Sequence, residues 1–372
     1  MKPLDRFISQ MVESARLAQT QDASAATALI QKALAESGLL PQGGLPQAPM
    51  APAAPFVDLN QAPGWRAGTS RRHGRGAVHA PHPSRHRANA DAQAPGRFVG
   101  GSFSCAAGAR RYKLYIPARP AQGPRPLVVM LHGCTQNPDD FATGTAMNAL
   151  AEEHGCLVLY PEQDKGANHN GCWNWFEPAH QGRERGEPAI LAGMTRQVIG
   201  EHGGDPARVY AAGLSAGGAM AAILGADYPE LYAAVGIHSG LPAGSAKDMM
   251  SGLKAMREPG KGRKLRQGVP AIVFHGDADH LVNPGNGEAV LAQFLRAQGA
   301  ELQQHTEAHD HAGRRCTRHT WRDSAGRSVV EHWQLHGAGH AWSGGNPAGS
   351  HTDAAGPSAS AEMLRFFLSH HG

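Results

Sequence analysis

The sequence predicts an α/β fold in which helices cover both faces of a mainly parallel sheet. Strand-like and helix-like patterns alternate from residue 97 onward, as expected for such a sheet. Leu127–Leu131 reads LVVML, a continuous apolar run typical of a buried parallel strand. With 372 residues, of which 41% are hydrophobic, the chain is long enough for one large domain with appendages. We therefore expect one α/β domain over residues 97–372.

The expected elements follow from the periodicity of apolar residues and from glycine or proline at their ends. Short apolar or alternating runs predict strands at 98–104, 111–116, 127–131, 157–160, 208–212, 233–237, 271–274, 316–322 and 329–335. Amphipathic or small-residue runs predict helices at 140–153, 189–201, 216–226, 284–298 and 358–369. The first two strands are expected to form a hairpin, and the last two are expected to be antiparallel.

The N-terminal quarter of the chain has a different character. Residues 1–40 carry two apolar runs at helical spacing and predict a helical hairpin. This hairpin either packs on the main domain, dimerises, or docks on a hydrophobic surface or polymer granule. Residues 41–96 are rich in Pro, Gly and Arg and predict a disordered linker, because they cannot bury enough apolar surface. The linker is read as a solvated tether, with binding to an acidic surface as the alternative.

Bulk properties exclude several classes of protein. The net charge of +4 does not by itself indicate a nucleic-acid partner. No apolar run reaches the length of a transmembrane helix, and residues 1–20 lack the apolar core of a secretory signal. Five cysteines without a C-x-x-C motif allow a disulfide or two, with a connectivity that the sequence does not define. The compartment is therefore left open.

The pentapeptide Gly213-Leu-Ser-Ala-Gly217 is the most informative motif. It follows an apolar strand and precedes a small-residue helix, which is the order of the nucleophile elbow in an α/β-hydrolase fold. Such a turn holds the serine hydroxyl exposed above the sheet, and the two glycines avoid clashes between the helix and the strand. Ser215 is the predicted nucleophile.

A serine nucleophile needs a histidine base and an acid that orients it, which follow it in the order acid, then histidine. The apolar strand 271–274 leads into a loop with two aspartates, and Asp279 fits the pattern H-G-x-x-D-x-x-V. Asp277 is the alternative, and the unused aspartate is expected to cap the loop backbone. His340 lies in a glycine-rich loop after the last strand and is the predicted base, whereas His336 is expected to pack or face outward.

An oxyanion hole is expected from two backbone amides. The first belongs to Ala216, which follows the nucleophile, and the second comes from the loop His132-Gly-Cys-Thr-Gln136. We assign the second donor to Cys134, with Thr135 as the next candidate.

Aromatic residues near these motifs suggest a substrate pocket. Trp173, Trp175 and Phe176 form either an aromatic wall for an apolar acyl chain or part of the core, and Trp342 adjoins His340. A polar segment with His305, His309 and His311 is expected to be an exposed loop, and its spacing does not define a metal site. We therefore expect neither a metal nor another cofactor.

Five segments in this order resemble the polyhydroxybutyrate depolymerase family of esterases, which is related to the feruloyl and acetylxylan esterases. They read LHGCTQ at 131–136, GCWNWF at 171–176, GLSAGG at 213–218, HGDAD at 275–279 and GHAW at 339–342. The resemblance runs from about residue 102 to the C-terminus. It implies Ser215, Asp279 and His340 as a triad that hydrolyses a short hydroxyacid polyester or a similar carboxylic ester.

The same resemblance bears on partners and location. It implies an ester or polyester substrate, and an extracellular protein. The sequence departs from secreted depolymerases because we see neither a signal peptide nor a substrate-binding module after the catalytic domain, so a cytoplasmic location is the alternative. A feruloyl or acetylxylan esterase is the alternative activity. Docking on a surface or granule through residues 1–96 is a further expectation.

Overall fold

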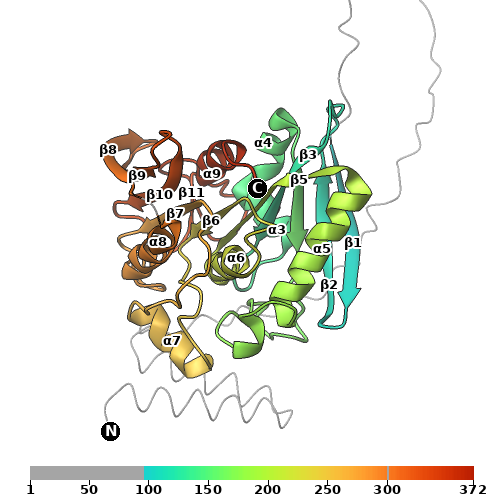
Figure 1. Ribbon diagram of the computed structural model, residues 1–372, viewed down its shortest axis with the longest axis horizontal. Coiled ribbons are helices and arrows are strands. Elements are labelled where there is room, and N and C mark those ends of the chain that lie inside the picture. Colours follow the sequence, from blue (N-terminus) through green and yellow to red (C-terminus); the bar gives the residue numbers. More distant parts are fainter. Residues whose placement is uncertain (1–95, 300) are drawn as a thin grey trace, which may run out of the picture. The chain divides into compact units, whose positions relative to one another are not determined.

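The computed structural model describes residues 96–299 and 301–372, which form a ten-stranded sheet with helices on both faces (Figure 1). The expected α/β-hydrolase fold with a mainly parallel, doubly covered sheet is therefore confirmed. The expected helical hairpin of residues 1–40 and the linker of 41–96, apart from Gly96, lie outside the described residues.

The sheet has a parallel centre and antiparallel flanks. Its strand order is β1-β2-β4-β3-β5-β6-β7-β10-β9-β8, and the strands from β4 to β10 in this order pair in parallel. The strands are β1 (Arg97–Cys105), β2 (Gly108–Ile116), β3 (Arg125–Leu131), β4 (Leu157–Pro161), β5 (Gly204–Leu214), β6 (Ala234–His238), β7 (Ala271–Gly276), β8 (Gln303–His311), β9 (Arg314–Arg322) and β10 (Ser328–Leu335). A separate pair consists of β11 (Trp342–Ser343) and β12 (Thr352–Asp353).

The helices divide between two hydrophobic cores, one on each face of the sheet. They are α3 (Pro138–Thr145), α4 (Met147–His154), α5 (Gly186–His202), α6 (Ala216–Asp227), α7 (Met249–Arg257), α8 (Gly285–Gln298) and α9 (Ala359–Leu368), with a short 3₁₀ turn at Pro178–His180. Side chains of α5, α6 and α8 contribute to one core, and those of α3, α4 and α9 contribute to the other. Successive residues of a central strand point alternately into the two cores. This explains why the central strands have continuous apolar sequences.

The single helix expected over 140–153 is wrong, because the chain forms two helices there. Ala146 adopts a left-handed conformation, with φ of 51°, and its amide closes α3 on the carbonyl of Ala142 at 3.1 Å. The turn is held from outside as well, since a Cβ at Gly144 would lie 2.8 Å from Cγ2 of Thr352. Tertiary packing thus interrupts a helical pattern that the local sequence would allow to continue.

The polar segment expected as an exposed loop is instead β8. It pairs antiparallel with β9 from Gln303 to His311 and forms one edge of the sheet. Most of its side chains are exposed, so the apolar alternation by which strands are recognised in a sequence is missing. The antiparallel pairing expected for the last two long strands is confirmed, because β9 pairs with β10 in that way.

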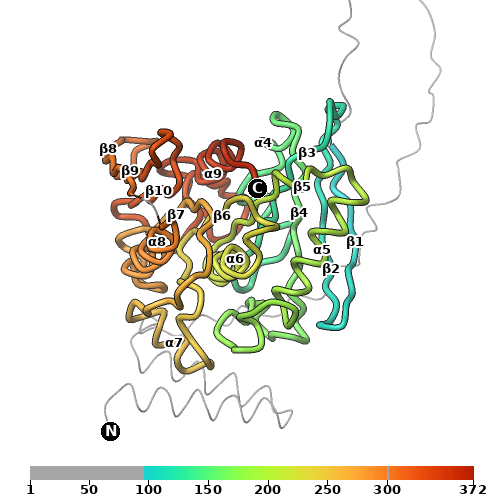
Figure 2. The backbone as a smooth tube through the Cα atoms, viewed as in Figure 1, coloured from blue at the N-terminus to red at the C-terminus, as the bar shows by residue number. Residues whose placement is uncertain are grey.

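The topology brings the ends of distant segments together. Parallel strands β3, β5, β6, β7 and β10 end at the same edge of the sheet, so the loops that follow them are neighbours. The C-terminus returns to the sheet beside β5, where the Gly372 amide donates to the carbonyl of Ala207 at 2.7 Å (Figure 2). Within the described residues, no helix has the length and apolarity that spanning a membrane requires.

Candidate active site

Ser215 occupies the sharp turn between β5 and α6. Its backbone has φ of 58° and ψ of −119°, a conformation that is rarely adopted by a residue with a side chain. The turn is held on both sides, since the Ser215 amide donates to the carbonyl of His238 at 2.9 Å and the Ser215 carbonyl accepts from the Ala219 amide at 2.9 Å. The serine is half-buried, whereas its neighbours Leu214 and Ala216 are buried.

Glycines on either side of Ser215 make this turn possible. A Cβ at Gly217 would lie 2.0 Å from the backbone oxygen of Leu131, and one at Gly213 would lie 2.4 Å from the carbonyl of Gly217. Real Cβ atoms do not approach backbone atoms so closely, so any side chain would push α6 away from the end of β3. The G-x-S-x-G pattern thus has a steric cause in this fold.

Asp279 and His340 form a pair at the carboxyl ends of β7 and β10. Oδ2 of Asp279 lies 2.7 Å from Nδ1 of His340, and the Asp279 side chain is fully buried. The other carboxylate oxygen, Oδ1, accepts from the amides of Leu281 and Val282 at 2.9 Å each. The carboxylate therefore has a fixed orientation, and it faces the Nδ1 atom of the histidine.

A second histidine, His275, also faces this carboxylate. Its Nε2 lies 3.4 Å from Oδ2 of Asp279 and 3.0 Å from the carbonyl of Val282. Burial opposes the ionisation of Asp279, but hydrogen bonds from His275, His340 and the Val282 amide outweigh it and hold the pKa of the carboxyl well below its usual range. The sequence alone does not reveal this role of His275, although the residue opens the H-G-x-x-D pattern.

The alternative acid, Asp277, is engaged elsewhere. Its Oδ2 lies 2.9 Å from Nδ1 of His336, and its Oδ1 accepts from the Gly337 amide at 2.6 Å. His336 also lies 2.9 Å from the hydroxyl of Thr317. Asp277 and His336 therefore join the ends of β7 and β10 to β9, and this second Asp–His pair is more exposed than the first.

His238 connects the serine turn with the histidine loop, and nothing in the sequence marked it. Its carbonyl accepts from the Ser215 amide, while its buried ring accepts from the Ser343 amide through Nε2 at 3.1 Å. Burial, aided by the charges of His275 and His340, lowers the pKa of His238 to about 3, so the ring is neutral. No hydrogen bond joins Oγ of Ser215 to His340 among residues 96–299 and 301–372; such contacts are often long before a substrate binds.

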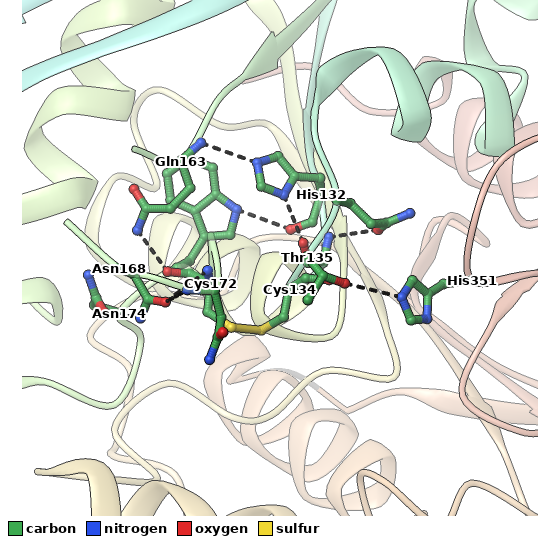
Figure 3. Close-up of a disulfide and its surroundings, with 12 residues drawn as sticks. His132, Cys134, Thr135, Gln163, Asn168, Cys172, Asn174 and His351 are labelled. Carbon is green, nitrogen blue, oxygen red and sulfur yellow. Dashed lines mark hydrogen bonds between the residues drawn. A yellow bond between two sulfur atoms is a disulfide. The ribbon is translucent and has the colours of Figure 1, made fainter. Parts of the chain in front are cut away.

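The loop after β3 is tied to a second loop by a disulfide between Cys134 and Cys172 (Figure 3). The Thr135 amide donates to the carbonyl of Asn170 at 2.8 Å, and His132 accepts from the Gln163 amide through Nε2 at 3.2 Å. Burial lowers the pKa of His132 to about 4, which keeps this ring neutral. The Cys134 amide has no hydrogen-bond partner among the described residues, so it can donate to a bound group. The Thr135 amide cannot, because it already donates to Asn170.

The tryptophans expected at the substrate pocket are mostly buried. Trp173 has no exposed surface and donates its indole N–H to the carbonyl of His132 at 3.1 Å. Trp342 packs beside His238, with ring centroids 5.1 Å apart, and donates to the hydroxyl of Ser360 at 3.0 Å. Trp175 is 6% exposed and packs edge-on against Phe176. The packing role that was left open for Trp173 and Trp175 fits these contacts, and contact with a substrate stays a prediction.

A polar cleft of about 660 Å³ borders the loop after β3. Thr135, Gln136 and Gly171 are among its lining residues, and charge of both signs comes from Arg110, Arg111, Glu162, Asp164 and Lys165. For metals, the described part of the chain contains no group of three His, Cys, Asp or Glu side chains that could hold an ion.

A mainly parallel sheet, a strained serine at a strand–helix turn and an acid–histidine pair at the same sheet edge define the α/β-hydrolase class. Within this class, the family model described as "Esterase PHB depolymerase", where PHB is polyhydroxybutyrate, matches residues 110–320. The chain belongs to this family.

Curated relatives include poly(3-hydroxyalkanoate) depolymerases as well as feruloyl and acetylxylan esterases. Poly(3-hydroxyalkanoate) depolymerase C from Paucimonas lemoignei is 33% identical over 229 residues, which cover 58% of this chain and 54% of that protein. Feruloyl esterase B from Thermothelomyces thermophilus is 30% identical over 215 residues, covering 51% of this chain and 71% of that protein. The chain spans about half the length of the depolymerases that it matches.

Solved structures support the fold. An acetyl xylan esterase from Aspergillus awamori superimposes with a TM-score of 0.55 at 20% identity, covering 70% of this chain and 94% of that one. At this level of identity the likeness concerns the fold alone.

Proposed function

We propose that the protein is a serine carboxylesterase that hydrolyses short hydroxyalkanoate polyesters or related carboxylic esters through Ser215, Asp279 and His340. The main support for the proposal is the 2.7 Å contact between Asp279 and His340. This contact lies at the edge of the sheet where Ser215 occupies the turn between β5 and α6. Because the Asp279 carboxylate accepts a hydrogen bond from Nδ1 of His340, the neutral form of His340 carries its proton on Nδ1. Its Nε2 is then free to act as a base.

The reaction proceeds through an acyl-enzyme. His340 takes the proton of Ser215 as Oγ attacks the ester carbonyl, and Asp279 stabilises the imidazolium that forms. The Cys134 and Ala216 amides donate to the oxyanion; the unpartnered Cys134 amide supports this assignment. His340 then protonates the leaving alcohol, and water attacks the acyl-enzyme in the same way. These steps need no metal and no other cofactor.

The substrate class rests on the family and its relatives. A polyester or short hydroxyacid ester agrees with the depolymerase relatives, which are among the most similar proteins. A feruloyl or acetylxylan ester is the second candidate, because feruloyl esterase B aligns over 71% of its length.

The test compares wild type with Ser215→Ala on short p-nitrophenyl esters and amorphous polyhydroxybutyrate. We expect the variant to lose about 10³-fold or more in kcat on every ester that the wild type hydrolyses. Ser324→Ala, at an exposed serine in the turn between β9 and β10, is the matched control and should retain full activity. A Ser215→Ala enzyme with near-normal rates would overturn the proposal.

The same experiment separates the two substrate classes. Activity on the polymer and on hydroxybutyrate esters, in excess of activity on methyl ferulate and acetylated xylan, supports a depolymerase. The reverse order of rates would assign the second candidate and keep the triad.

A further inference from the structure

The exposed large hydrophobic side chains of the described residues are confined to two segments. Met249, Met250 and Leu253 of α7 are 53%, 62% and 46% exposed, and Leu281 in the loop after Asp279 is 53% exposed. We refer to these four side chains as the α7 patch. Single exposed hydrophobic residues are common on protein surfaces, but a group of this kind usually marks a contact surface.

Helix α7 exposes more large apolar side chains than it buries. Its buried residues are the small Gly252 and Ala255, and Met256 packs partly buried against the core, whereas Met249, Met250 and Leu253 face solvent. A Cβ at Gly252 would lie 2.9 Å from Cβ of Phe176, so the helix backbone packs closely on that side chain. The exposure is not caused by fraying, because the Asp248 side chain caps the helix by accepting from the Ser251 amide at 2.7 Å.

The patch adjoins the proposed site along the chain that carries Asp279. The Asn283 amide donates to the carbonyl of Met256 at 2.7 Å, and the Asn286 side chain donates to the carbonyl of Ala255 at 2.9 Å, so the end of α7 is fastened to this loop. In the same loop, the Leu281 amide binds Oδ1 of Asp279. The loop that holds the catalytic acid is therefore joined to the C-terminal end of α7.

A second connection leads from α7 to the oxyanion loop. Phe176 and Trp175, on which α7 packs, follow Cys172, and the disulfide joins Cys172 to Cys134. In Figure 1, α7 lies at the margin of the domain beside α8. The helix thus has one face on the loops that frame the site, and its other face is exposed in the part of the chain that the structure describes.

The charge around α7 is mainly positive. Between residues 247 and 261, the exposed cations are Lys247, Lys254, Arg257 and Lys261, and the exposed carboxylates are Asp248 and Glu258. Glu258 is paired with Lys254 at 3.7 Å. Each ester bond that is cut in a polyester leaves a carboxylate on the acid side, so a partly hydrolysed polyester surface is both apolar and anionic. The patch and its rim match both properties.

We propose that the α7 patch docks on the surface of a water-insoluble aliphatic polyester that carries carboxylate chain ends. Docking holds the domain on the polymer with the loops around Ser215 next to the chains. The proposal rests on the proposed function for the polymer, and it concerns adsorption, which is measured separately from catalysis.

The test uses the full chain with Met249→Ser, Met250→Ser and Leu253→Ser combined. Adsorption to amorphous polyhydroxybutyrate particles and release of acid from them are measured beside kcat/KM on a soluble p-nitrophenyl ester. We expect adsorption and polymer hydrolysis to fall about tenfold or more, because several apolar side chains lose their contact. The soluble ester should be hydrolysed within about twofold of the wild-type rate, as is usual for exposed positions. Gln303→Ser with Gln304→Ser, at two exposed positions of β8, is the matched control and should adsorb normally.

A second variant tests the positive rim and does not depend on how the triple variant folds. Lys254→Glu with Arg257→Glu should weaken adsorption to a pre-hydrolysed, carboxylate-rich polymer more than adsorption to fresh polymer. Unchanged adsorption of both variants would overturn the proposal. A second result would also overturn it. If the wild type were a dimer, and the triple variant were a monomer that still adsorbed to the polymer, the patch would bind a second copy of the chain and not the polymer.

Lipid binding is the remaining alternative, and vesicles of phosphatidylglycerol test it. Stronger patch-dependent binding to these vesicles than to polyester would overturn the proposal. Repeating adsorption in a Ser215→Ala background separates docking from chemistry. Patch-dependent adsorption there supports the docking surface even if the proposed activity fails.

Discussion

Nδ1 of His340 lies 2.7 Å from Oδ2 of Asp279, although 61 positions separate the two residues in the chain. Two residues before the buried Asp279, Asp277 makes a similar contact with His336, at 2.9 Å. The loop after β7 thus supplies the aspartates of two aspartate–histidine pairs, and the two pairs differ in burial and in neighbours.

This duplication supplies a matched test of the catalytic acid. Asp279→Asn should lower kcat by about 10⁴-fold with a smaller change in KM, because an amide at this position stabilises the wrong tautomer of His340 and cannot stabilise its cation. Asp277→Asn, in the same loop, should keep kcat within about threefold and lower the melting temperature slightly. Steady-state kinetics on a p-nitrophenyl ester measure both. Equal losses of kcat in the two variants would contradict the assignment.

Replacement of Gly217 should prevent the serine turn from forming. In Gly217→Ala, the new Cβ would lie 2.0 Å from the backbone oxygen of Leu131, which cannot move without displacing β3. We expect a loss of about 3 kcal/mol or more in the free energy of unfolding. Urea denaturation measures this loss.

Gly200 in α5 is the control for that variant, because a Cβ there meets nothing within 4 Å. Gly200→Ala should raise stability by about 0.5–1 kcal/mol, since alanine loses less backbone entropy in a helix. Similar behaviour of the two alanine variants would argue against the close approach of α6 to β3.

The disulfide between Cys134 and Cys172 should support both stability and rate. It joins residues 38 positions apart, so its removal in Cys134→Ala with Cys172→Ala should cost about 2–4 kcal/mol of unfolding free energy. The Cys134 amide would also be held less firmly, so we expect kcat to fall more than KM changes. Cys105→Ala, at an exposed free thiol, is the control and should match wild type in melting temperature and rate.

Buried histidines predict a loss of stability in acid. Burial, aided by the charges of His275 and His319, lowers the pKa of His332 to about 3, whereas an unfolded chain titrates near pH 6.5. The unfolded state therefore binds more protons between these values, so this contribution to stability is complete above pH 6.5. It declines as pH falls towards 3, by about 1.4 kcal/mol per pH unit.

The measurement is urea denaturation of His332→Phe between pH 7 and pH 4. We expect its stability to depend less steeply on pH than that of wild type, by about 1.4 kcal/mol per unit for the one group removed. His371→Phe, at an exposed histidine near the C-terminus, should keep the wild-type dependence. An unchanged slope in His332→Phe would refute the burial argument.

Much of this architecture can be predicted from the sequence because its signals are local. The serine turn is marked by a strand, two glycines and a small-residue helix within about 20 residues, and each of these has a steric cause. The edge strand β8 escaped prediction because a strand exposed on most of its surface needs no apolar alternation. The contacts of His238 with Ser215 and Ser343 could not be predicted, because they form only when β6 lies between β5 and β7.

The Cys134–Cys172 bond could not be predicted for a related reason. Five cysteines allow many pairings, and the observed one depends on the loop at 163–174 folding back over the end of β3. The motifs alone predict the pairing of Asp279 with His340. The second histidine, His275, contacts Asp279 only because the chain turns back after β7, and no motif predicts this contact.

The sequence of β8 also affects how copies of this molecule meet one another. An edge strand offers unpaired backbone groups to any neighbouring chain, and flat apolar edges therefore lead to ribbon-like stacking. Here the edge strand carries mostly Gln, His, Glu and Asp side chains, and Glu307 forms an ion pair with Arg318 of β9. Extending the sheet by a second copy would have to strip water from these groups, which is unfavourable. A domain with such an edge can expose an apolar helix elsewhere with less risk of polymerising through its sheet.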